Sequence, residues 1–191
     1  MKNKLNRTLL VALSVVLLAG LVLAALPSTV NAESVVIDAN RGGRGGNGAP
    51  GTPSGNGNGL TPLSAVEAQG LQQAILEEYG AYNLYTAVIA QFGSAIPFSQ
   101  IVLSEQQHAN ALIRQAEKYG VAVPANPGLA QPVTFSDLAQ ACAAGAAAEI
   151  ADAALYDRLK TETTREDILR VYDRLQSASL KQHLPEFELC D

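Results

Sequence analysis

The sequence predicts an all-α domain built as an antiparallel four-helix bundle, and three observations support this. Apolar residues follow helical spacing from about residue 64 to the end of the chain, and no alternating strand pattern competes. Glycine, proline and capping residues divide this region into four segments. The connections are short, long and short, which fits two hairpins joined by one long crossover between the second and third helices.

The first expected hairpin has clear start and stop signals. Ser64 and Glu67 form a capping box that opens the first helix, and Gly93 ends it. The second helix begins at Pro97, since proline is favourable in a first turn, and stops at Gly120. These two helices are therefore joined by only a few residues.

The second expected hairpin follows a long connection that carries three prolines. Its first helix begins between residues 134 and 136, with Asp137 in the first turn, and runs to about residue 160. Its second helix opens at Thr163 or Thr164, because threonine is a favourable N-cap, and continues to about Glu188.

Residues 1–32 are predicted to be a secretory signal peptide. Lys2, Lys4 and Arg7 precede an apolar run of 18 residues, and a small-residue cleavage pattern ends at Ala32. The chain is therefore expected to be secreted or held in the cell envelope. An uncleaved membrane tether is the alternative, because 18 apolar residues just reach the length of a membrane span.

A glycine-rich segment separates this signal from the domain. Nine of the 20 residues at 41–60 are glycine, so the segment cannot bury enough apolar surface to become ordered. Residues 33–60 are predicted to be a flexible linker, followed by the bundle at 61–191. Without the signal the chain has 10 basic and 18 acidic residues, a formal charge of −8, which argues against nucleic acid as a partner.

The buried face of each expected helix carries polar residues of the kind that bind metals. Steps of three and four residues keep one face of a bundle helix toward the interior. The four predicted faces are Leu71, Ile75, Glu78, Tyr82, Tyr85 and Ile89; Ile101, Glu105, His108 and Leu112; Leu138, Cys142, Gly145, Glu149, Asp152, Tyr156 and Leu159; and Ile168, Tyr172, Leu175, Ser179, His183, Phe187 and Cys190.

Electrostatics favours a metal centre among these residues. The acidic side chains would converge in an interior where no predicted face supplies a lysine or arginine. Two like charges 4 Å apart repel by about 4 kcal/mol even at an effective dielectric constant of 20. Two divalent cations would offset three or four carboxylates, and oxygen ligands with two imidazoles suit iron, manganese or zinc. The alternatives are carboxylates protonated by burial, or helices rotated so that these residues face water.

Several motifs together resemble those of ferritin-like and rubrerythrin-like proteins. The stretch from Glu78 to Tyr85 resembles their first-helix signature, and Glu105-Gln-Gln-His108 resembles the Glu-x-x-His of their second helix. The stretch from Glu149 to Tyr156 repeats the first pattern. Over about residues 64–188 the chain is similar to a ferritin-like family catalogued as domain of unknown function 2202. The resemblance implies two metal ions, most simply iron, that react with dioxygen or peroxide and are held by Glu78, Glu105, His108, Glu149 and His183.

The fourth helix departs from that pattern. In these families it also carries Glu-x-x-His, whereas Leu180 stands three residues before His183. Asp152 is the favoured sixth metal ligand because it lies on a buried face, and Glu186 is the alternative. Pro185 is expected to disturb the helix at this point.

Further residues are expected around the centre. Tyr85 and Tyr156 would hydrogen-bond to ligands, relay single electrons, or serve as ordinary core aromatics. Glu77, about 100° round the helix from Glu78, is expected to face solvent. Cys142 and Cys190 would lie on the same side of the centre, where a disulfide between them is feasible in an exported protein.

The predicted reaction class is redox, with ferrous ions, a small reductant or a partner protein as the electron source. A manganese centre that dismutates peroxide is a second enzymatic possibility. The alternative from another class is a non-catalytic envelope module with a structural metal, such as zinc, or with none. The sequence leaves the oligomeric state open.

Overall fold

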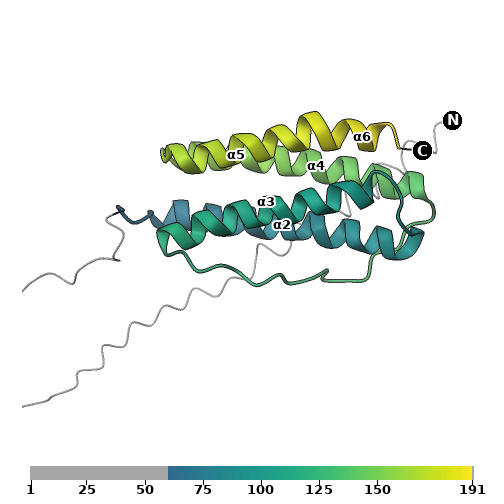
Figure 1. The fold of residues 1–191 in the computed structure, drawn as a ribbon, viewed down its shortest axis with the longest axis horizontal. Helices are drawn as coiled ribbons and strands as arrows, with labels where there is room; N and C mark the ends of the chain where they lie inside the picture. The colour runs from purple at the N-terminus through teal and green to yellow at the C-terminus, as the bar shows by residue number, and fades with distance from the viewer. Residues whose placement is uncertain (1–59, 191) are drawn as a thin grey trace, which may run out of the picture.

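The computed structural model describes residues 60–190, and this part of the chain is all-α, as predicted (Figure 1). The predicted signal peptide and all of the predicted linker except Leu60 lie outside it. No strand occurs among the described residues. The elements are α2 (Ala65–Phe92), α3 (Phe98–Tyr119), α4 (Leu138–Thr161), α5 (Glu166–Ala178), the π-helix η2 (Ser179–His183) and α6 (Leu184–Glu188).

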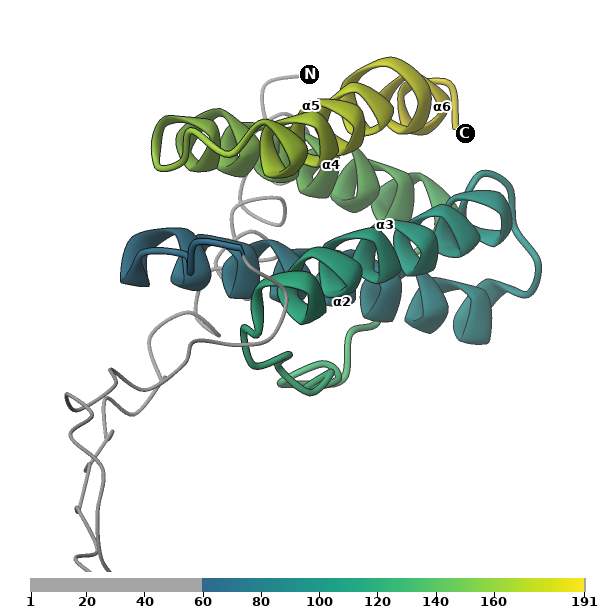
Figure 2. The same ribbon diagram turned by 60° about the vertical axis from the view of Figure 1, so that its left-hand side comes forward.

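The helices form two hairpins that lie against each other (Figures 1 and 2). α2 pairs with α3, and α4 pairs with the continuous run of α5, η2 and α6. Between the hairpins, α2 contacts α4 and α3 contacts α5. The interior therefore receives side chains from all four helical rods.

The connection between α3 and α4 runs along α2. Gln72 Nε2 donates to the carbonyl of Ala122 at 2.8 Å, near the start of α2. At the other end, Gln91 Nε2 donates to the carbonyl of Phe135 at 2.6 Å and Gln91 Oε1 accepts from its N–H at 3.0 Å. These bonds fix the connection over most of the length of α2.

Local capping chemistry sets most helix ends. Glu67 N–H donates to Ser64 Oγ at 3.2 Å and Ser64 N–H to Glu67 Oε2 at 2.8 Å, which is the predicted capping box. Gly93 and Gly120 follow α2 and α3 with φ of 79° and 69°, which favours glycine. Asp137, by contrast, is the N-cap of α4 and not a first-turn residue, because its carboxylate accepts from Gln140 N–H at 2.8 Å.

The last rod begins later than predicted. α5 starts at Glu166, not at Thr163 or Thr164. The Thr163 hydroxyl donates to Glu67 Oε1 at 2.8 Å and accepts from Arg165 N–H at 3.1 Å. This side chain therefore ties the turn to α2 instead of capping a helix, and the N-cap of α5 is Arg165, two residues further on.

A disulfide joins Cys142 in α4 to Cys190, which follows α6, with 5.9 Å between the two Cα atoms. The sequence left this pairing open. α4 is long and apolar enough for a membrane span by length and composition. The same composition is met by core helices, and α4 carries buried Glu149 and Asp152 on its inner face.

Gly145 of α4 leaves room for an aromatic ring. A Cβ built at this position would lie 2.6 Å from the ring of Phe187, which is 2% exposed. We expect Gly145→Ala to lower the free energy of unfolding by about 1–3 kcal/mol, because the ring must move. Gly80→Ala in α2 is the control, since its Cβ meets nothing within 4 Å and alanine should stabilise the helix slightly. Denaturant titration of both variants checks this, and equal stabilities would contradict it.

Candidate metal centre

Two groups of carboxylate and imidazole side chains meet in the interior. One contains Glu78, Glu105 and His108, and the other contains Glu105, Glu149 and His183. Within each group, one ligand atom from each residue lies within 4.8 Å of the others. Glu105 belongs to both groups, so the two can share one carboxylate.

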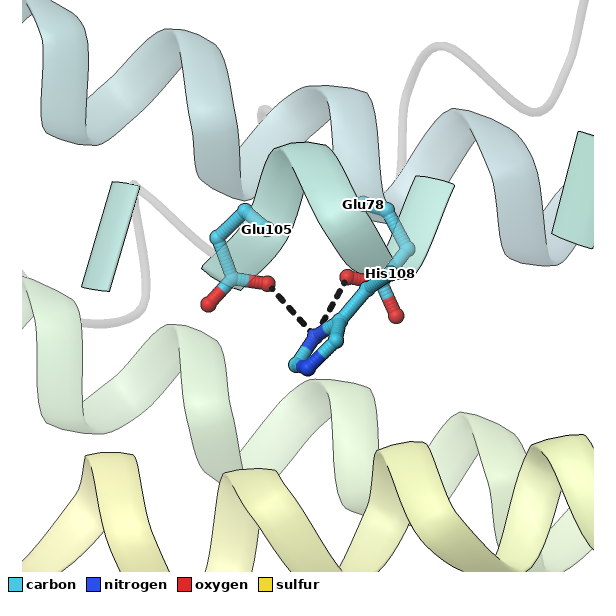
Figure 3. A group of neighbouring side chains, drawn as sticks. All are labelled: Glu78, Glu105 and His108. Atoms are coloured by element: carbon cyan, nitrogen blue, oxygen red, sulfur yellow. Dashed lines mark hydrogen bonds and ion pairs between the residues drawn. The ribbon is translucent and has the colours of Figure 1, made fainter. Parts of the chain in front are cut away.

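Figure 3 shows the first group, in which Glu78 from α2 and Glu105 from α3 both direct an oxygen at the ring of His108. His108 Nδ1 lies 3.3 Å from Glu78 Oε2 and 3.2 Å from Glu105 Oε2. In the second group, His183 Nδ1 lies 3.0 Å from Glu105 Oε1 and 3.3 Å from Glu149 Oε2. The two oxygens of Glu105 therefore face different histidines.

Two tyrosines hold the outer carboxylates from the opposite hairpin. Tyr85 of α2 donates to Glu149 Oε1 of α4 at 2.6 Å. Tyr156 of α4 donates to Glu78 Oε1 of α2. Each bond leaves the other oxygen of the same carboxylate facing its histidine. Of the alternatives left open by the sequence, the tyrosines make hydrogen bonds to Glu149 and Glu78, while a role in electron relay stays a prediction.

Burial and the histidines together set the proton affinities of the first group. Glu78 and Glu105 are 1% and 2% exposed. Burial raises the pKa of Glu78 to about 8, against the opposing effect of its hydrogen bond with His108. Burial alone would also raise the pKa of Glu105, but its hydrogen bonds with His108 and His183 outweigh this and lower it to about 2.

Burial shifts the pKa of the two histidines in the opposite direction to that of the carboxylates. Burial lowers the pKa of both, but their carboxylate partners outweigh it and raise the pKa to about 10 for His108 and about 9 for His183. Within the described part of the chain, the carboxylates of the two groups form ion pairs with these two imidazoles alone. Protons on the two rings therefore offset charge that metal ions would otherwise offset.

The residues present fit a pair of metal ions. Glu78 Oε2 and Glu105 Oε1 are buried, and apart from their contacts with His108 at 3.3 Å and His183 at 3.0 Å they accept no hydrogen bond. Such oxygens keep free lone pairs directed into the cluster. Three carboxylates and two imidazoles are a donor set that suits iron, manganese or zinc.

The structure places Asp152 beside the two groups but in neither. Its Oδ2 accepts from Ser179 Oγ at 2.6 Å, and its Oδ1 is buried without a hydrogen-bond partner. Glu186, the alternative sixth ligand, is exposed. The assignment of Asp152 as a ligand stays a prediction.

Glu77 is less exposed than the sequence predicted. Its side chain is only partly open to solvent. Burial, together with the charge of Glu149, raises its pKa. Angular distance from Glu78 alone did not predict this, because it does not say how closely neighbouring helices cover a side chain.

The π-helix positions His183 and was missed by sequence reasoning. Ser179 and His183 are both buried, while Leu180 is 42% exposed. The N–H of Leu184 donates to the carbonyl of Ser179, five residues earlier, so the chain gains one residue in this turn. Ser179 therefore occupies the inward position one turn before His183. The predicted inner face of this rod already indicated the extra residue. From Leu175 to Phe187 it runs in three successive steps of four residues, whereas a regular α-helical face alternates steps of three and four.

Pro185 is the second residue of α6, two residues after the π-helix ends at His183. It lacks a backbone N–H and cannot continue an α-helical hydrogen-bond ladder through this turn. The disturbance expected near Pro185 thus takes the form of a π-helical turn that ends at His183, and the rod continues beyond it.

Comparison with known proteins supports the fold and leaves the activity open. No protein-family model matches the chain. No curated protein gives a significant match. The crystal structure of a hypothetical protein from Methanococcus jannaschii is similar, with a TM-score of 0.60 and 24% sequence identity over 69% of this chain and 83% of that one. At this identity the similarity shows the fold alone.

Proposed function

We propose that residues 61–191 form a ferritin-like four-helix bundle that holds two metal ions, most simply iron, and carries out redox chemistry with dioxygen or peroxide. The observation that carries the proposal is the position of Glu105, which belongs to both groups of ligand atoms. The paired hairpins and the long connection along α2 agree with a bundle of the one-crossover kind.

Each of these side chains would have a separate role at such a centre. Glu78 and His108 would hold one ion, Glu149 and His183 the other, and Glu105 would lie between them. The ions, when bound, supply the one-electron redox steps. Tyr85 and Tyr156 fix the orientation of Glu149 and Glu78, so that one oxygen of each stays directed inward.

Proton release accompanies metal binding in this account. In the metal-free domain, the raised pKa values keep protons on His108, His183 and Glu78 at neutral pH. Metal ligands must be deprotonated, so these protons leave to solvent when ions enter. Buried aliphatic and aromatic residues pack on either side of the centre, and the His108 side chain is 13% exposed.

The proposed reaction is tested with the chain loaded anaerobically with ferrous iron. We expect hydrogen peroxide to oxidise the iron, with an absorbance change that saturates near one peroxide per pair of ions, because each peroxide accepts two electrons. The same chain loaded with zinc is the control and should remain spectroscopically silent. An iron-loaded chain that shows no change with peroxide or dioxygen would contradict the redox proposal.

A structural metal site is the second candidate function. Zinc binds carboxylate and imidazole ligands tightly and outranks ferrous iron at most sites. The predicted signal peptide favours this alternative, because export before metal loading would expose the domain to whichever ion the exterior supplies. In that case a chelator would unfold the domain, and no metal form would turn over peroxide.

A further inference from the structure

The disulfide between Cys142 and Cys190 lies close to the proposed metal centre. Cys142 is two helical turns before Glu149 on α4 and is 1% exposed. It packs in the same buried cluster as Tyr85 and Phe187, and Cys190 packs against that cluster. One sulfur of the pair therefore faces the interior on the side of Glu149.

An uninterrupted series of side chains connects this cluster to a predicted ligand. The rings of Phe187 and Tyr85 have centroids 5.2 Å apart. The hydroxyl of Tyr85 donates to Glu149 Oε1 at 2.6 Å. Gly145, one turn after Cys142, lets the Phe187 ring lie directly against the α4 backbone. The buried side chains of this one cluster therefore lie between the sulfurs and Glu149.

The other sulfur is open to an external thiol. Cys190 follows α6 near the end of the chain and is partly exposed. A thiolate attacking Cys190 Sγ would form a mixed disulfide there and release the thiol of Cys142 inside. The pair thus has one member that solvent reaches and one that faces the aromatic cluster.

The arrangement is present on only one side of the centre. Tyr156 makes the equivalent bond to Glu78, but its ring neighbours Tyr172, with centroids 5.4 Å apart. The chain has only two cysteines, so no second pair stands behind Tyr156.

We propose that the Cys142 and Cys190 pair, in its dithiol form, supplies two electrons to the metal centre for the reduction of peroxide. This inference rests on the proposed function. The two thiols lose two electrons and two protons as the S–S bond forms. Peroxide gains them as its O–O bond breaks, which yields two water molecules. An external dithiol of the thiol–disulfide exchange class then reduces the disulfide and becomes oxidised itself.

The test counts electrons in the full chain loaded with two ferrous ions. One sample keeps its disulfide, and in the other a phosphine reduces it before being removed by desalting. Hydrogen peroxide is titrated anaerobically, and thiols are counted by mass after alkylation. We expect the disulfide form to consume one peroxide per chain and the dithiol form two, with Cys142–Cys190 re-formed at least tenfold faster than in the metal-free dithiol chain.

Matched tyrosine variants test the route. Tyr85→Phe removes the bond to Glu149 on the side of the disulfide, and Tyr156→Phe removes the equivalent bond on the other side. The measured quantity is the rate of thiol loss divided by the rate of peroxide loss. We expect this ratio to fall in Tyr85→Phe relative to Tyr156→Phe.

Two results would overturn the proposal, and they differ from each other. One result is that both forms consume one peroxide per chain while the thiols persist, or that the thiols are lost at the same rate without iron. The disulfide would then have only a structural role, and the proposed redox centre would be unaffected. If neither form consumes peroxide, the proposed function fails together with this inference.

Discussion

Glu105→Gln is expected to abolish tight binding at both metal positions. The substitution keeps the size of the side chain but removes the carboxylate that the two groups share. We expect affinity for both ions to fall by more than about 100-fold, beyond the 10–100-fold typical of changes outside the ligand set. Calorimetric titration with ferrous or manganous ions measures this as the loss of both binding events.

Two further variants make the result specific. Glu78→Gln changes a residue that belongs to only one group, so one binding event should remain. Glu117→Gln, an exposed position on the same helix as Glu105, should leave both events intact. Circular dichroism establishes that each variant is folded. Equal losses in the Glu105 and Glu78 variants would show that the two positions do not share Glu105 as described.

The metal-free domain is expected to lose stability as pH rises from about 6.5 to 10. His108 and His183 have a pKa near 10 and 9 in the folded state, against 6.5 when unfolded. The folded state thus binds more protons in this range, and stability falls as they leave. The raised pKa of Glu78, about 8 against 4.5, adds a fall with the same sign that begins at lower pH. We expect a total loss on the order of a few kcal/mol.

Thermal unfolding with a chelator at pH 6.5, 8 and 9.5 measures this loss. With metal bound the ligands are already deprotonated, so the loaded chain should not show the same fall. His108→Gln combined with His183→Gln should remove the part of the fall that the two rings cause, while the part that comes from the raised pKa of buried Glu78 should remain. A metal-free wild type whose melting temperature rises from pH 6.5 to 9.5 would contradict the described charge balance.

The sequence predicted the all-α class because its signals are local. The Ser64 capping box, Gly93 and Gly120 act within a few residues of the helix ends that they define. Thr163 gave a misleading start because its hydroxyl is used by Glu67, a residue 96 positions away. Tyr82 and Ile89 were expected in the core but are only partly buried, since helical spacing does not say how closely neighbouring helices cover a face.

Spacing and charge together predicted which polar side chains would lie near one another in the interior. The buried faces drawn from steps of three and four residues brought Glu78, Glu105, His108, Glu149 and His183 together, as the structure does. The pairing of Tyr85 with Glu149, rather than with a ligand on its own helix, depends on how the hairpins meet, and spacing within one helix does not contain that information. The π-helical turn was visible only as an irregular step pattern before His183.

The metal content of the chain shows directly whether the domain holds a pair of ions. The chain would be isolated from the compartment in which it resides, and its metals counted by elemental mass spectrometry beside the His108→Ala variant. The account predicts about two iron or manganese ions per chain, with a clear loss in the variant, because His108 supplies the nitrogen of one group. A chain without bound metal, or a content unchanged by His108→Ala, would contradict it.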